Sequence, residues 1–181
     1  MLSRLSQRLH NVRTLAGAGI LAPARPDRLL RVARVLVQFG PTPAAGYASC
    51  AARYPNEIGI IDELGTLTFA QIHERTNALA HALSDAGIVE GDGVAVMCRN
   101  HRYFIETTVA CSKLGANALY LNTMFAAPQI TDVVKREGPR AMVFDEEFEN
   151  LVHDAAVRRK RFIRTLRTDK RCSVFQGESH Q

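Results

Sequence analysis

The chain has 181 residues, of which 46% are hydrophobic and 23% are charged, the proportions of a globular domain large enough to bury a core. Its charge falls into three blocks: residues 1–46 hold seven arginines and one aspartate (+6), residues 47–157 hold eight basic and fifteen acidic residues (−7), and residues 158–181 hold eight basic and two acidic residues (+6). Since the middle of the chain is acidic, a basic nucleic-acid-binding domain is disfavoured, and no apolar run approaches the roughly 18 residues of a membrane span.

The four cysteines show no pattern of metal ligands. None of Cys50, Cys98, Cys111 and Cys172 belongs to a C-x-x-C pair or to a spacing typical of zinc sites. Cys98 and Cys111 lie within apolar patterns, where a thiol is usually a small buried hydrophobe. This usage predicts a reducing environment, and therefore a cytoplasmic protein.

The basic N-terminal segment, residues 1–46, is expected to contain an amphipathic helix and a linker. Helical periodicity runs from Asp27 to Phe39. The apolar face is formed by Leu29, Leu30, Ala33, Leu36 and Val37. The polar face is formed by Arg28, Arg31, Arg34 and Gln38. Two interpretations stay open: a helix packed on the domain, or a peripheral contact of Asp27–Phe39 with an anionic membrane surface. Gly40–Gly46, with two prolines, is predicted to be the linker.

Residues 47–155 alternate between helical patterns and short apolar runs. Thr68 forms a capping box with Gln71 and precedes a helix that ends before Gly87, and Asn100 is expected to cap the next helix. The expected elements in order are a helix over 47–53, strands over 58–62 and 66–68, a helix over 68–86, a strand over 94–97, a helix over 100–115, a strand over 118–121, a helix over 128–138 and a strand over 141–144. This alternation predicts an α/β fold with a partial, mainly parallel sheet and flanking helices.

The sequence shows no established catalytic motif. It contains no GxxxxGK[ST] phosphate loop, no GxSxG elbow and no HExxH zinc helix. His73, Asn77 and His81 share one helical face, which we interpret as an exposed polar face rather than a metal site. The acidic cluster, defined as Asp145, Glu146, Glu147 and Glu149, is expected to start the next helix, where negative charge meets the helix dipole favourably. We therefore assign no catalytic, cofactor-binding or metal-binding residue.

The character of the sequence changes near residue 156. From Arg158 to Arg171 basic residues recur every one to three positions, and residues 176–181 are polar. We expect residues 156–181 to be a disordered basic tail, with a nucleic-acid or membrane contact as the alternative.

Several stretches of the middle segment resemble the N-terminal part of the adenylate-forming acyl-CoA synthetases, the AMP-binding family. Leu67–Ile72 is similar to the family's opening LTYxEL motif, Gly91–Val96 to the stretch that follows, and Lys113–Asn122 to the KxGAxxxxLN segment. Phe144–Phe148 most resembles actinobacterial long-chain fatty-acid–CoA ligases. The order and spacing of these pieces across residues 30–155 identify the chain as a member of that family.

The resemblance implies ATP-dependent activation of a fatty acid to an acyl-adenylate, followed by thioester formation with coenzyme A. The family uses ATP, magnesium and coenzyme A, but its phosphate loop and C-terminal catalytic motifs lie beyond the part matched here. We therefore expect a truncated homologue that is inactive alone and needs no cofactor. A frameshift or truncated gene would explain the change near residue 156. The alternatives are one half of a split ligase, partnered by a complementing fragment, and a small α/β binding module with a basic tail.

Overall fold

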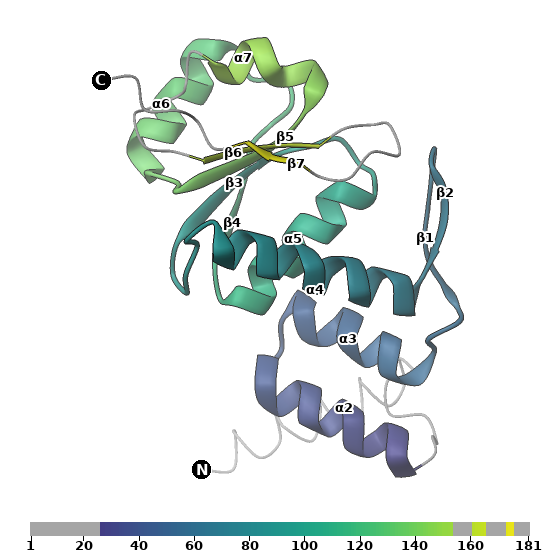
Figure 1. Cartoon of the computed structure of the whole chain (residues 1–181). Coiled ribbons are helices and arrows are strands. Elements are labelled where there is room, and N and C mark those ends of the chain that lie inside the picture. The colour runs from purple at the N-terminus through teal and green to yellow at the C-terminus, as the bar shows by residue number, and fades with distance from the viewer. Residues whose placement is uncertain (1–25, 154–160, 166–172, 176–181) are drawn as a thin grey trace, which may run out of the picture.

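The computed structural model describes residues 26–153, 161–165 and 173–175 (Figure 1). The first 25 residues of the expected N-terminal segment and most of the expected tail lie outside the described residues. In chain order the elements are α2 (Pro26–Phe39), α3 (Pro43–Arg53), β1 (Ile58–Asp62), β2 (Gly65–Thr68), α4 (Phe69–Asp85), β3 (Gly93–Met97), α5 (Arg102–Leu114), β4 (Asn117–Tyr120), α6 (Ala127–Glu137), β5 (Ala141–Asp145), the 3-10 turn η1 (Glu146–Phe148), α7 (Glu149–His153), β6 (Arg161–Thr165) and β7 (Ser173–Phe175).

The main sheet has the strand order β4-β3-β5-β6-β7. Strand β3 pairs in parallel with β4 on one side and with β5 on the other, and β6 pairs in parallel with β5. Strand β7 alone runs antiparallel to its neighbour. Strands β1 and β2 form a separate antiparallel hairpin. The predicted α/β class with a mainly parallel sheet is confirmed.

Alternate residues of the central strands pack on opposite faces of the sheet, as the pleat requires. One face belongs to the α4–α5 cluster, formed by Ala80, Leu83, Ile88, Val94, Val96, Cys98, Ala110, Cys111, Ala141 and Val143. The other belongs to the α6–α7 cluster, formed by Ala95, Met97, Leu121, Ile130, Val134, Met142, Phe144, Phe148 and Val152. The sheet is therefore the middle layer of three, with α4 and α5 on one side and α6 and α7 on the other (Figure 1).

Helix α4 matches its sequence prediction because its ends are determined locally. The Thr68 hydroxyl accepts a hydrogen bond from the Gln71 amide (3.3 Å), and the Gln71 side chain accepts one from the Thr68 amide (2.9 Å). The helix stops at Asp85, and Gly87 adopts a positive φ of 82° that favours glycine. Reciprocal capping of this kind satisfies backbone amides that the helix cannot bond itself.

Two helix starts differ from the prediction. Helix α3 begins at Pro43, inside the expected linker, because the Thr42 hydroxyl caps it and proline suits a first helical turn. Helix α5 has His101 at its N-cap instead of Asn100, and His101 makes no capping bond. The carboxylate of Asp62 reaches across from β1 and accepts a hydrogen bond from the Arg102 amide (2.9 Å). A residue 40 positions away therefore supplies the cap.

Helix α2 forms where expected, but it packs on the protein through Val32 and not through the apolar face that the sequence pattern indicates. Val32 is its buried residue, and the Arg28 guanidinium donates to the Arg53 carbonyl of α3 (2.7 Å). The expected apolar face stays exposed. Among the described residues no helix combines the length and the hydropathy that crossing a bilayer requires.

Strands β6 and β7 lie inside residues 156–181, the range expected to be a disordered tail. Strand β6 extends the sheet beyond β5 over the register Ala141↔Arg161 to Asp145↔Thr165. The division of the chain into three segments stays a prediction.

Candidate functional site at the carboxyl edge of the sheet

The connections of the parallel strands reverse direction between β3 and β5. From β3 the chain passes through α5 to β4 on one side, and then returns through α6 to β5 on the other side of β3. In open α/β sheets, ligands bind at such a reversal, in the crevice outside the carboxyl ends of the strands. The loops after Met97 and after Asp145 are therefore the first place to search for a site.

Four charged or titratable side chains meet at this carboxyl edge, and we call them the edge clasp: Arg99, His101, Asp145 and Glu147. Asp145 Oδ2 accepts hydrogen bonds from the Arg99 amide (2.7 Å) and from His101 Nε2 (2.9 Å). The Arg99 guanidinium makes two bonds to the Glu147 carboxylate (2.9 and 2.8 Å) and lies over the Phe148 ring, 5.2 Å from its centroid. The clasp ties the loop after β3 to the loop after β5.

The His101–Asp145 pair is the buried part of the clasp. The two side chains are 6% and 5% exposed. With Asp145 ionised, its carboxylate only accepts hydrogen bonds, and the tautomer of His101 that forms this bond is the one protonated at Nε2. The other ring nitrogen, Nδ1, is buried and has no hydrogen-bond partner within the described part of the chain. The pair can fix the geometry of the two loops that it joins.

The acidic cluster is expected to start the next helix, and its members lie at the starts of η1 and α7. Glu146 and Glu147 start η1, and Glu149 lies in the first turn of α7. Asp145 is the N-cap residue of η1, but its side chain makes no capping bond there and is buried against His101, 44 positions earlier in the chain. Sequence reasoning missed His101, because nothing local distinguishes it from an exposed loop histidine.

The helical face of His73, Asn77 and His81, expected to be exposed and polar, is partly covered by α5. Lys113 of α5 donates to the His73 carbonyl (3.2 Å), to the Thr76 hydroxyl (2.7 Å) and to Asn77 Oδ1 (2.6 Å), so His73 and Asn77 are half-buried between α4 and α5. Burial lowers the pKa of Lys113 to about 8, and burial followed by the charge of Lys113 lowers the pKa of His73. His81 is exposed. Within residues 26–153, 161–165 and 173–175 no three potential metal ligands come together.

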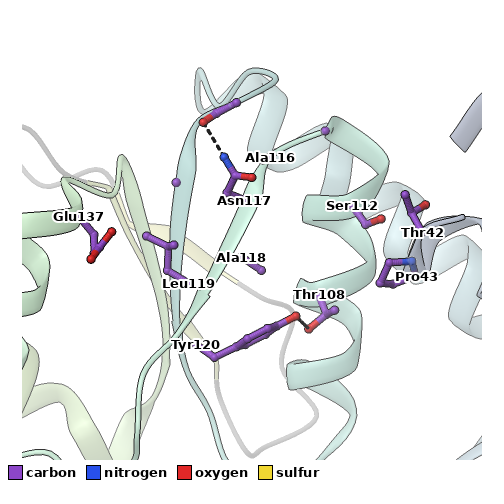
Figure 2. Close-up of a pocket in the computed structure, with 13 residues that line it drawn as sticks. Thr42, Pro43, Thr108, Ser112, Ala116, Asn117, Ala118, Leu119, Tyr120 and Glu137 are labelled. Carbon is purple, nitrogen blue, oxygen red and sulfur yellow. Dashed lines mark hydrogen bonds between the residues drawn. The ribbon is translucent and has the colours of Figure 1, made fainter. Parts of the chain in front are cut away.

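A concavity of about 650 Å³ runs along the outer side of β4, the edge strand (Figure 2). It is lined by residues from β4, from α5 and from the start of α3, with Glu137 as the one charged residue among them. Tyr120 crosses it, donating to the Thr108 hydroxyl (3.2 Å), and Asn117 donates to the Gly91 carbonyl (2.9 Å). The concavity is mainly neutral and offers the open edge of a strand rather than a charged pocket.

The sequence matches a known family model. The model of the AMP-binding enzymes matches residues 47–179. The range extends past residue 155, the boundary expected from the change in charge.

Among curated relatives, a fatty acid–[acyl-carrier-protein] ligase of Streptomyces coeruleorubidus, ScoC, is 30% identical over 102 residues, which are 56% of this chain and 20% of that protein. A long-chain-fatty-acid–CoA ligase of Mycobacterium tuberculosis is 32% identical over 78 residues, 43% of this chain and 16% of that protein. The chain thus spans about a fifth of the length of such relatives.

Solved structures share the fold. A candidate long-chain-fatty-acid CoA ligase from Rhodopseudomonas palustris CGA009 superposes with a TM-score of 0.64 at 25% identity, covering 68% of this chain and 32% of that one. A benzoate CoA ligase from Burkholderia xenovorans LB400 superposes with the same TM-score of 0.64 at 17% identity, covering 68% of this chain and 26% of that one.

Proposed function

The chain belongs to the AMP-binding enzyme family, and on that premise we propose that it is the scaffold-forming first part of a fatty-acid–CoA ligase and is inactive by itself. The complete reaction would be ATP-dependent activation of a fatty acid to its acyl-adenylate, followed by transfer of the acyl group to coenzyme A. The names of its relatives, which include fatty-acid ligases from Streptomyces and Mycobacterium, support this substrate class.

The observation that carries the proposal is the self-neutralised edge clasp. Adenylate formation needs cations or amides that face a triphosphate, and carboxylate oxygens that hold its magnesium ion. At the carboxyl edge, Arg99 is bound to Glu147, and Asp145 is bound to His101 and to the Arg99 amide. These described residues do not fit ATP and magnesium, because their charges already satisfy one another. We therefore derive no catalytic step from them.

The test is fatty-acid-dependent exchange of pyrophosphate into ATP by the purified 181-residue chain. We expect no exchange above background, with the full-length Streptomyces relative assayed in parallel as a positive control. Exchange that requires both the chain and the fatty acid would overturn the proposal. A further assay for acyl-CoA would then show whether the second step also occurs.

A second candidate function, one half of a split ligase, is favoured by the open edge of β4. In the parallel ladder the amides of Asn117 and Leu121 donate to Asp92 and Val96 on the β3 side. Strand geometry therefore turns the amide and carbonyl groups of Ala118 and Tyr120 outward, toward the concavity. An extended segment of a complementing ligase fragment could pair with these groups as an added strand. The chain covers 32% of the Rhodopseudomonas structure, so most of such a fold would come from the partner.

Co-expression with variants of Ala118 tests whether a partner segment pairs with the backbone amide of that residue. Ala118→Pro removes an outward amide, which an edge strand tolerates, whereas Ala118→Ser keeps it. If the remaining part of a related ligase restores solubility or activity with the wild-type chain and with Ala118→Ser, Ala118→Pro should abolish the effect. No restoration by any chain would count against a split enzyme.

A further inference from the structure

Helix α2 carries an exposed apolar stripe, formed by Leu29, Leu30, Ala33, Leu36 and Val37. Leu30 is 72% exposed and Val37 is 88% exposed. Large apolar side chains scattered singly on a surface need no explanation, but a contiguous stripe over a whole helix indicates a contact surface. These five positions recur with the spacing of one helical face.

Among the described residues, the stripe stays exposed where α2 packs on α3. Attachment to α3 uses Val32, which is buried, and Arg28, whose guanidinium donates to the Arg53 carbonyl. The helix lies at the end of the molecule remote from the sheet, with its neighbour α3 between it and α4 (Figure 1). The stripe is therefore presented outward at an extremity of the fold.

The charge around the stripe is positive. Residues 26–53 hold four arginines and one aspartate (+3), whereas residues 54–157 hold seven basic and fifteen acidic residues (−8). Arg34 is exposed and borders the stripe, and Arg31, also exposed, forms a surface ion pair with Asp27 (2.8 Å). Residues 158–181 form a second basic block of +6, so charge attracts the chain to an anionic surface, and the apolar stripe distinguishes α2 from that second block.

We propose that α2 binds the interface of an anionic lipid membrane, with its apolar stripe inserted among the acyl chains and its arginines at the headgroups. A stripe of leucine and valine beside arginines is the composition of helices that lie in the membrane plane. The 14 residues of α2 are too few to cross a bilayer, which takes about 20. Lipid matches both features of this surface, since acyl chains accept the apolar stripe and anionic headgroups attract the arginines.

The remainder of a ligase is a poorer occupant. Helix α2 precedes residues 47–179, the range that the family model matches, so it lies outside the part of the sequence that the family shares. Binding through α2 is also independent of catalysis, and it would hold even if the chain never contributes to acyl-adenylate formation.

The test is co-sedimentation of the full 181-residue chain with two kinds of vesicle: phosphatidylcholine alone, and phosphatidylcholine with about a third phosphatidylglycerol, whose negative surface potential attracts basic segments. We expect binding to the anionic vesicles that weakens as salt screens the charges. The double variant Leu30→Gln/Val37→Gln should bind about tenfold more weakly, because less apolar surface enters the bilayer. Arg34→Gln should lose about fivefold on anionic vesicles only.

The matched control is Ile61→Gln, which removes an equally exposed apolar side chain from the β1–β2 hairpin. It should bind like the wild type, and all variants should show the wild-type circular dichroism, since none of the replaced side chains is buried. Three results would overturn the proposal: no binding to anionic vesicles, unchanged binding by the double variant, or a lipid-free dimer that the double variant converts to a monomer. The last result would assign the stripe to a second copy of the chain.

Discussion

Asp62 and Arg102 connect the β1–β2 hairpin to α5 through a buried ion pair. Their side chains are 6% and 9% exposed, and the guanidinium makes bonds of 2.6 and 2.9 Å to the two carboxylate oxygens. The hydrogen bonds from Arg102 hold the pKa of Asp62 well below its usual range. A lowered folded-state pKa stabilises the protein above the unfolded pKa of about 3.9, and that stabilisation is lost as the pH falls from there toward the folded-state pKa.

Asp62→Asn should therefore lower the free energy of unfolding at neutral pH by about 3 kcal/mol, because it leaves the buried Arg102 without its counter-charge. It should also reduce the loss of stability on acidification below about pH 4. Urea unfolding followed by circular dichroism measures both effects. Asp132→Asn, at an exposed position of α6, should change stability by less than about 0.5 kcal/mol. Equal stability of the two variants would contradict the structural role given to the pair.

Lys113 gives stability a second dependence on pH, of the same sign as that of Asp62 but in the alkaline range. Burial lowers its folded-state pKa to about 8, while an unfolded lysine has a pKa of about 10.4. Between these values the unfolded chain binds more protons, so this residue makes stability rise with pH. In Lys113→Met the free energy of unfolding should not rise between about pH 8 and pH 10.4, as measured by urea denaturation across that range. An identical pH profile in the variant would show that Lys113 titrates normally.

At the scale of elements, the N-terminus of α4 is capped by two side chains that are three residues apart, Thr68 and Gln71. Thr68→Ala removes the hydroxyl that accepts from the Gln71 amide, and should cost about 1 kcal/mol of unfolding free energy. Ser84→Ala, at an exposed position in the last turn of the same helix, is the matched control and should not destabilise. Thermal or urea denaturation distinguishes the two. Equal losses in both variants would mean that the capping box contributes nothing.

Elements with local signals were predictable, and contacts between distant residues were not. Thr68, Gln71 and Gly87 determine α4 from within a short window, and the strands read as short apolar runs. The orientation of α2 could not be read from its pattern, because apolar residues such as Val32 and Val37 lie on different sides of it and only tertiary packing selects one. His101 and Asp145 are 44 positions apart, so their pairing required the sheet. Residues 161–165 look like a solvated basic segment, yet they add a strand to β5.

At the scale of the whole molecule, the sheet has an open edge at β4. The outward amides of Ala118 and Tyr120 should exchange with solvent deuterium much faster than the Leu121 amide, which donates to Val96 (2.9 Å). Residue-resolved hydrogen exchange on the isolated chain checks this. Comparable protection at all three amides would mean that another segment or another copy already covers the edge.

The two hydrophobic clusters on either side of the sheet contain different sulfur-bearing side chains. The buried thiols, Cys98 and Cys111, belong to the α4–α5 cluster, and the buried thioethers, Met97 and Met142, belong to the α6–α7 cluster. Burial raises the pKa of Cys111 to about 12, so it should resist alkylation until that side opens. Peptide mass spectrometry after mild alkylation and peroxide treatment would then time the opening of each side separately. Partly exposed Cys50 and exposed Met124 would serve as fast internal references. If the thiols and the thioethers react at one common rate, the sandwich unfolds as a single unit. If their rates differ, the faster reaction identifies the side of the sheet that opens first.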